Sequence, residues 1–142
     1  MPFALPIRSA TRNGVARVWV EVALTVLTSK GVNPMPFRVS TGSEITTVSE
    51  FVASALGLSA GGRSGSVETS AGDVTGRIVP VRFQFPPDPT SGAALTASSE
   101  WLIVPGTSRL CFLGFRDVHR YFTIETDDAD MTFVERPLPL PI

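Results

Sequence analysis

The stretch of sequence that decides the fold is Phe37-Arg38-Val39-Ser40-Thr41-Gly42-Ser43-Glu44-Ile45-Thr46. A short apolar segment enters a turn of small residues, and an extended segment resumes at Ile45. Gly42 permits the backbone angles of a tight reversal, and the hydroxyls of Thr41 and Ser43 can satisfy backbone groups in the bend. The sequence therefore predicts that the chain reverses here and projects the side chain of Ser40 from the turn.

Most of the remaining chain predicts short strands. Residues 17–28 alternate in hydropathy with period two and are rich in valine, and the preceding Asn13-Gly14 pair could close a hairpin with Leu5–Ser9. Further strands are expected at Met35–Val39, Ser66–Ser70, Thr75–Phe85, Trp101–Val104, Leu110–Leu113, Thr123–Thr126 and Met131–Glu135. Pro80 indicates an edge position or a local break in pairing.

Helices are expected to be few and short. Thr47 or Ser49 could cap a helix over Thr47–Gly57, and Asp117–Phe122 could form one or two helical turns. Loops are expected at residues 29–34, 61–65 and 86–99, with a turn at Ala71-Gly72-Asp73. We therefore predict a single all-β domain with one or two short helices in a closed or sandwich-like architecture.

The composition excludes several classes of protein. The 142 residues are 43% hydrophobic and 18% charged, which argues against disorder, and a net charge of -1 implies neither nucleic acid nor an anionic membrane surface. The single cysteine, Cys111, cannot form an internal disulfide, and with His119 as the single histidine a metal site is unlikely, so no metal or cofactor is expected. No apolar run reaches the roughly 18 residues of a membrane helix, and the N-terminus lacks the basic region of a signal peptide, so a cytoplasmic location is expected.

Three segments, in order, carry a family resemblance. The Ser40 turn, with the segment Ala55–Leu58 after the expected helix, resembles the active-site loop of retropepsin-like aspartic peptidases, in which an Asp stands where this chain has Ser40. The hairpin around Gly72–Gly76 falls where that family has its flap, and Cys111–Asp117 is similar to its hydrophobic-hydrophobic-Gly element. Three ordered segments are more specific than one Thr-Gly-Ser, and the resemblance covers roughly residues 16–135.

The resemblance implies a retropepsin-like closed barrel, the acid protease fold, acting as a homodimer on an extended peptide or protein substrate. It places Ser40, Thr41 and Gly42 at the catalytic position, with Thr41 hydrogen-bonding to the partner subunit. It assigns substrate binding to the flap residues Gly72, Asp73, Val74, Thr75 and Gly76, and structural roles to Ser43, Leu113, Gly114, Arg116 and Asp117. Residues 1–15 would be an extended segment that could pair with a second copy, and 136–142 a proline-rich tail.

The chemistry of that family needs two close carboxylates that share a proton, one from each chain. Two Ser40 hydroxyls cannot replace them, so the chain as written is expected to be inactive, whether Ser40 is natural or introduced. A nucleophilic Ser40 would need a nearby base, and a surface position for His119 is the simpler expectation. The alternatives are a non-catalytic peptide-binding or oligomerisation module on the same fold, or an unrelated β-barrel with a similar turn.

Overall fold

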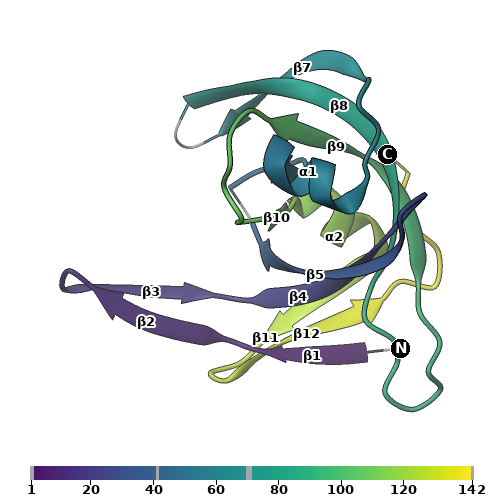
Figure 1. Ribbon diagram of the computed structural model, residues 1–142. Coiled ribbons are helices and arrows are strands. Elements are labelled where there is room, and N and C mark those ends of the chain that lie inside the picture. The colour runs from purple at the N-terminus through teal and green to yellow at the C-terminus, as the bar shows by residue number, and fades with distance from the viewer. Residues whose placement is uncertain (1, 41, 70–71, 142) are drawn as a thin grey trace.

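A computed structural model describes residues 2–40, 42–69 and 72–141 (Figure 1). Its elements, in chain order, are β1 (Pro2–Pro6), β2 (Arg8–Arg12), β3 (Val15–Trp19), β4 (Glu21–Thr28), β5 (Gly31–Val39), β6 (Thr47–Ser49), α1 (Glu50–Leu56), β7 (Arg63–Thr69), β8 (Gly72–Gln84), β9 (Thr96–Val104), β10 (Phe112–Leu113), α2 (Phe115–Tyr121), β11 (Phe122–Thr126) and β12 (Asp130–Glu135). The predicted all-β class with short helices is confirmed. Thr41, Ser70 and Ala71 lie outside the described residues.

The largest sheet has the strand order β4-β5-β10-β6-β9-β8-β7, and an additional pairing between β4 and β8 closes it into a ring with β7 on the outside. The short strand β10 lies between β5, to which it is parallel, and β6, to which it is antiparallel. Figure 1 shows the long β8 arching over α1, with β7 alongside it. The ring confirms the prediction of a closed β-architecture.

Strand β5 corrects the predicted loop at residues 29–34, because only Ser29 and Lys30 form the turn after β4. Two prolines are accommodated because alternate residues of a strand point their N–H groups to opposite sides. The N–H of Arg38 donates to the carbonyl of Cys111, away from β4, and Pro34 and Pro36 share the parity of Arg38. On that side β10 pairs only with Arg38 and Val39, so the missing proline donors cost no ladder bond.

Other predicted boundaries shift by a few residues. The strand at residues 17–28 is interrupted at Val20, and β7 and β9 begin earlier than expected, inside the predicted loops. Helix α1 begins one turn later than Thr47, with Ser49 as its N-cap and Gly57, at φ 78°, as its C-cap. The second helix begins at Phe115 rather than Asp117. Pro80 does mark a local break, because β7 pairs with β8 as far as Ile78 and β4 pairs with it from Arg82.

The interior of the ring is filled by aromatic and aliphatic side chains. Trp101 is fully buried and packs against Phe37 and Phe83, with both ring-centroid separations at 5.3 Å. Trp101 therefore packs inside the ring, whereas Trp19 lies half-buried on β3, outside it. None of the helices in the described part of the chain is long and apolar enough to cross a membrane.

A second sheet joins the N-terminal strand to the end of the domain. β1 pairs with β12, which pairs with β11, and Phe3 stacks on Phe133 with ring centroids 4.8 Å apart. β1 is thus part of the domain's own packing. The Asn13-Gly14 turn joins β2 to β3 in a hairpin that projects from the body of the molecule (Figure 1), one element later than the predicted partner at Leu5–Ser9.

Candidate functional site

The turn that follows β5 is held by a backbone hydrogen bond to β10. The backbone N–H of Ser40 donates to the carbonyl of Leu113 at 2.9 Å, which holds Ser40 at the end of the strand. The side chain of Ser40 is half-buried, Gly42 is exposed, and the hydroxyl of Ser43 donates to the carbonyl of Ile45 at 3.0 Å. Ser40 and Leu113 are therefore in direct backbone contact, and Ser43 bonds within the turn itself.

The exit of the turn packs directly on Gly114. A Cβ atom built on Gly114 would lie 2.3 Å from the carbonyl carbon of Ile45 and 2.5 Å from the backbone nitrogen of Thr46, so only glycine fits without moving the backbone. The N–H groups of Phe115 and Arg116 donate to the carbonyls of Ser43 and Glu44 at 2.9 and 3.1 Å. The first turn of α2 therefore holds the exit of the Ser40 turn in place.

A buried carboxylate ties these segments to the ring. Asp117 is 4% exposed, and its Oδ2 accepts hydrogen bonds from the hydroxyls of Thr46, at 2.5 Å, and Ser99, at 3.0 Å. Thr46 Oγ1 in turn accepts from the N–H of Gly114, and Ser99 Oγ accepts from Trp101 Nε1. Burial raises the pKa of Asp117, against the hydrogen bonds from Thr46 and Ser99, which lower it. These contacts link α2 to the exit of the turn and to β9 through one buried carboxyl group.

A groove of about 450 Å³ runs beside the turn. It lies between the exit of the turn, the first turn of α2 and the strand β7. Its lining residues are Glu44, Ile45, Arg63, Ser66, Val67, Glu68, Ile78, Glu100 and Arg116. β7 is the last strand of its sheet, and among the described residues no strand pairs with its outer edge.

The charges of the groove are mostly paired. Arg116 lies 3.5 Å from Glu44, and Arg63 forms an ion pair with Glu100. The hydrogen bond from Arg63 and, more weakly, the charges of Arg63 and Arg116 lower the pKa of Glu100. These four side chains are well exposed, so their pairing shapes the charge of the groove more than it stabilises the fold.

None of the predicted flap residues, Gly72–Gly76, lines the groove. Gly72–Gly76 open β8, whereas the groove is lined on the flap side by residues of β7 and by Ile78. Thr75 and Gly76 instead line a separate depression with Ser64–Ser66 and Pro105. A Cβ on Gly76 would lie 2.2 Å from the carbonyl oxygen of Ile103, so this glycine is required by packing. The β7 residues were missed because a hairpin sequence does not show which strand faces a groove.

His119 lies apart from the turn. Its ring stacks on Phe115 with centroids 5.3 Å apart, and its carbonyl accepts a hydrogen bond from Arg136 Nε at 2.8 Å. Its ring nitrogen Nδ1 lies 3.3 Å from Arg136 Nη2, and among the described residues no hydrogen bond joins His119 to Ser40. His119 is therefore not placed as the base that a nucleophilic Ser40 would need.

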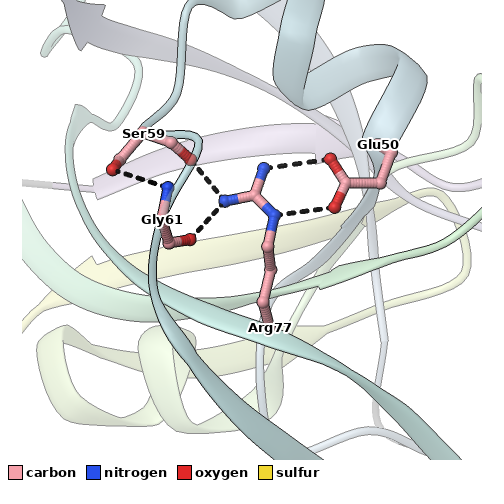
Figure 2. A network of polar contacts seen from close by, with 4 residues as sticks. All are labelled: Glu50, Ser59, Gly61 and Arg77. Carbon is pink, nitrogen blue, oxygen red and sulfur yellow. Dashed lines mark hydrogen bonds and ion pairs between the residues drawn. The ribbon is translucent and has the colours of Figure 1, made fainter.

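The base of the β7–β8 hairpin is anchored by Arg77 (Figure 2). Its Nε and Nη2 donate to the two carboxylate oxygens of Glu50, at 2.6 and 2.9 Å, in a bidentate pair. Its Nη1 donates to the carbonyls of Ser59 and, at 2.6 Å, Gly61. The hydrogen bond from Arg77 is the main cause that lowers the pKa of Glu50. One guanidinium thus joins the hairpin, α1 and the loop between them.

Comparison with known proteins supports the fold. No protein-family model and no curated sequence matches this chain. The fold is similar to that in the crystal structure of a retropepsin-like aspartic protease from Rickettsia conorii, with a TM-score of 0.59 over 94% of this chain and 91% of the other. The two sequences are 15% identical, so the likeness is one of fold. The chain has a retropepsin-like fold, with Ser40 at the turn after β5.

Proposed function

We propose that this protein binds extended peptides as a homodimer with the architecture of an aspartic endopeptidase, and that Ser40 leaves it without peptidase activity. The observation that carries the proposal is the groove between the exit of the Ser40 turn and the open edge of β7. An extended peptide can add to an exposed strand edge through main-chain hydrogen bonds, and the groove gives its side chains a place to lie.

Ser40 does not line the groove within one chain; the lining begins at Glu44. The chemistry of aspartic peptidases needs two such turns, and each chain has one. A second copy related by a twofold axis would bring two Ser40 turns together and extend the groove across both chains. Two hydroxyls at that axis supply neither a general base for water nor a protonated carboxyl for the peptide carbonyl. The loss of activity would follow from this proposed dimer.

The experiment that tests the proposal restores the acid. We expect Ser40→Asp to cleave peptides at mildly acidic pH and to be blocked by a transition-state-mimic inhibitor, with a rate about 10² to 10⁴ above that of the wild type. Ser40→Asn is the matched control, because its side chain has similar size but cannot ionise. A folded, dimeric Ser40→Asp chain that neither cleaves nor binds any peptide would overturn the proposal.

The second candidate is a peptide-binding module on the same fold that cannot become a peptidase when one residue is changed. Ser40 favours it, because a serine stands where the catalytic Asp would be. It predicts that both the wild type and Ser40→Asp bind peptides and that neither cleaves them. The same assays therefore separate the two candidates.

A further inference from the structure

The charges along the groove do not balance. Arg116 is paired with Glu44 and Arg63 with Glu100, so each cation that lines the groove already has a carboxylate partner. Glu68 also lines the groove, on β7, and makes no ion pair or side-chain hydrogen bond among the described residues. The groove therefore carries one negative charge that nothing in the described part of the chain neutralises.

The register of the hairpin places a second acid, Asp73, beside Glu68, although Asp73 itself does not line the groove. Glu68 on β7 lies directly opposite Asp73 on β8, so the two side chains share one face of the hairpin. Like charges directly opposite each other in an antiparallel pair repel and destabilise the sheet. The arginine on the same face, Arg77, lies towards the base of the hairpin and is held by Glu50. A cation supplied from outside the chain would relieve the repulsion between Glu68 and Asp73.

We infer that the groove selects extended peptides that place a Lys or Arg side chain beside Glu68 on β7. The inference rests on the proposed peptide-binding function and names its substrate class. A peptide that adds to the outer edge of β7 lies next to Ser66, Val67 and Glu68. Ser66 and Glu68 face one side of the hairpin, and Val67 and Ile78 face the other, so alternate side chains of the peptide would meet the charge of Glu68 and an apolar surface. An ammonium or guanidinium group donates charge-assisted hydrogen bonds to a carboxylate, whereas a Glu side chain at the same place would meet a second negative charge.

The expected size of the preference follows from exposure. Glu68 is exposed, and exposed ion pairs contribute up to about 1 kcal/mol, so a basic peptide should bind at most about fivefold more tightly than its neutral counterpart. The preference should shrink as ionic strength rises, because salt screens exposed charges.

The test measures fluorescence anisotropy of labelled peptides that share one extended host sequence and carry Lys, Arg, Gln or Glu at one scanned position. The wild-type dimer should prefer Lys and Arg at one register. Glu68→Gln should abolish that preference and Glu68→Lys should invert it towards Glu. Glu125→Gln, which removes an exposed carboxylate on β11 outside the groove, is the matched control and should leave the preference unchanged. Thermal unfolding of each variant at the wild-type temperature shows that the fold is intact.

The outcomes distinguish the preference for basic peptides from peptide binding itself. Equal binding of all the peptides by the wild type, or a preference for basic peptides that persists in Glu68→Gln, would overturn the inference and leave peptide binding standing. Failure of every peptide to bind would overturn the proposed function together with the inference.

Discussion

Gly114 is the residue at which the geometry of the turn is most tightly constrained. The backbone of Glu44–Thr46 lies within 2.6 Å of the place where a Cβ would be, and backbone cannot move aside as a flexible side chain can. We expect Gly114→Ala to lower the free energy of unfolding by about 1–3 kcal/mol, measured by chemical denaturation. Gly61→Ala is the control, since its Cβ would meet nothing closer than 3.8 Å and should change stability little. Equal stability of the two variants would contradict the packing described here.

Asp117 should make stability depend on pH in an unusual direction. Its pKa in the folded protein is raised above the ordinary value of 3.8 by burial, so the carboxyl is neutral in both states at low pH and the cost of burying its charge appears as pH rises through the folded pKa. Asp117→Asn lacks this cost. The unfolding free energy of the variant minus that of the wild type should therefore increase with pH above 3.8 and level off above the folded pKa.

This slope is measured by urea denaturation of both proteins across that pH range. The slope does not depend on any pH-independent loss of stability that the substitution itself causes. A flat difference would mean that Asp117 is not desolvated as the structure indicates.

The residues of the turn could be predicted from the sequence because their chemistry is local. Ser40, Ser43, Leu113 and Gly114 are recognisable from small residues and hydrophobic neighbours. Ser40 bonds to Leu113, and Gly114 packs against the exit of the turn. The partners of Asp117 could not be predicted, because Thr46 and Ser99 are brought to it by the closure of the ring. Hydroxyl side chains are common in strands, and nothing in their spacing marks those that meet a buried acid.

At the scale of elements, the β7–β8 hairpin depends on the four hydrogen bonds of Arg77 (Figure 2). We expect Arg77→Ala to lower the free energy of unfolding by about 1–3 kcal/mol and to speed amide hydrogen exchange in β7 and the loop around Gly61. Arg77→Lys should not rescue the loss, because an ammonium cannot form the bidentate pair with Glu50.

Arg82→Ala is the matched control for Arg77. It removes an exposed arginine from the same strand, with no ion pair among the described residues. If both alanine variants exchange at the wild-type rate, Arg77 does not anchor the hairpin.

Element boundaries were less predictable than element types. The helix after the turn was expected because Ser49 and Gly57 are local signals, and both cap α1. The loop predicted over residues 29–34 was wrong because Pro34 and Pro36 are tolerated only where one side of β5 is largely open, which depends on the length of β10. That length is a property of the sheet and is not encoded near the prolines.

At the scale of the whole molecule, the N-terminal strand closes the second sheet. Phe3 is 8% exposed, stacks on Phe133 and meets Phe122 edge to face at 5.4 Å. Phe3→Ala should therefore cost about 3–5 kcal/mol in the unfolding of the chain. Circular dichroism during thermal unfolding checks this. A variant as stable as the wild type would show that β1 contributes little to the domain, and would favour the earlier expectation that residues 1–15 serve the pairing of two copies.

The fold class could be predicted because three segments, in the expected order, each match a feature of the same fold. A tight turn, a glycine against that turn and a hairpin of small residues agree with one another, and the ring of strands joins them. The location of the groove along β7 could not be predicted from one chain's pattern. The dimer, the cytoplasmic location and the hydrogen bond of Thr41 to a partner stay predictions.

The central claim is that two Ser40 turns meet at a twofold axis, and disulfide cross-linking of Ser40→Cys tests it most directly. The wild type is its own control, because burial raises the pKa of the Cys111 thiol to about 11 and leaves it unreactive. Ser91→Cys, on an exposed loop, controls for random collision. The account predicts a covalent dimer of Ser40→Cys on mild oxidation and none of the wild type or Ser91→Cys. A Ser40→Cys chain that stays monomeric under conditions in which its thiol is accessible would contradict it.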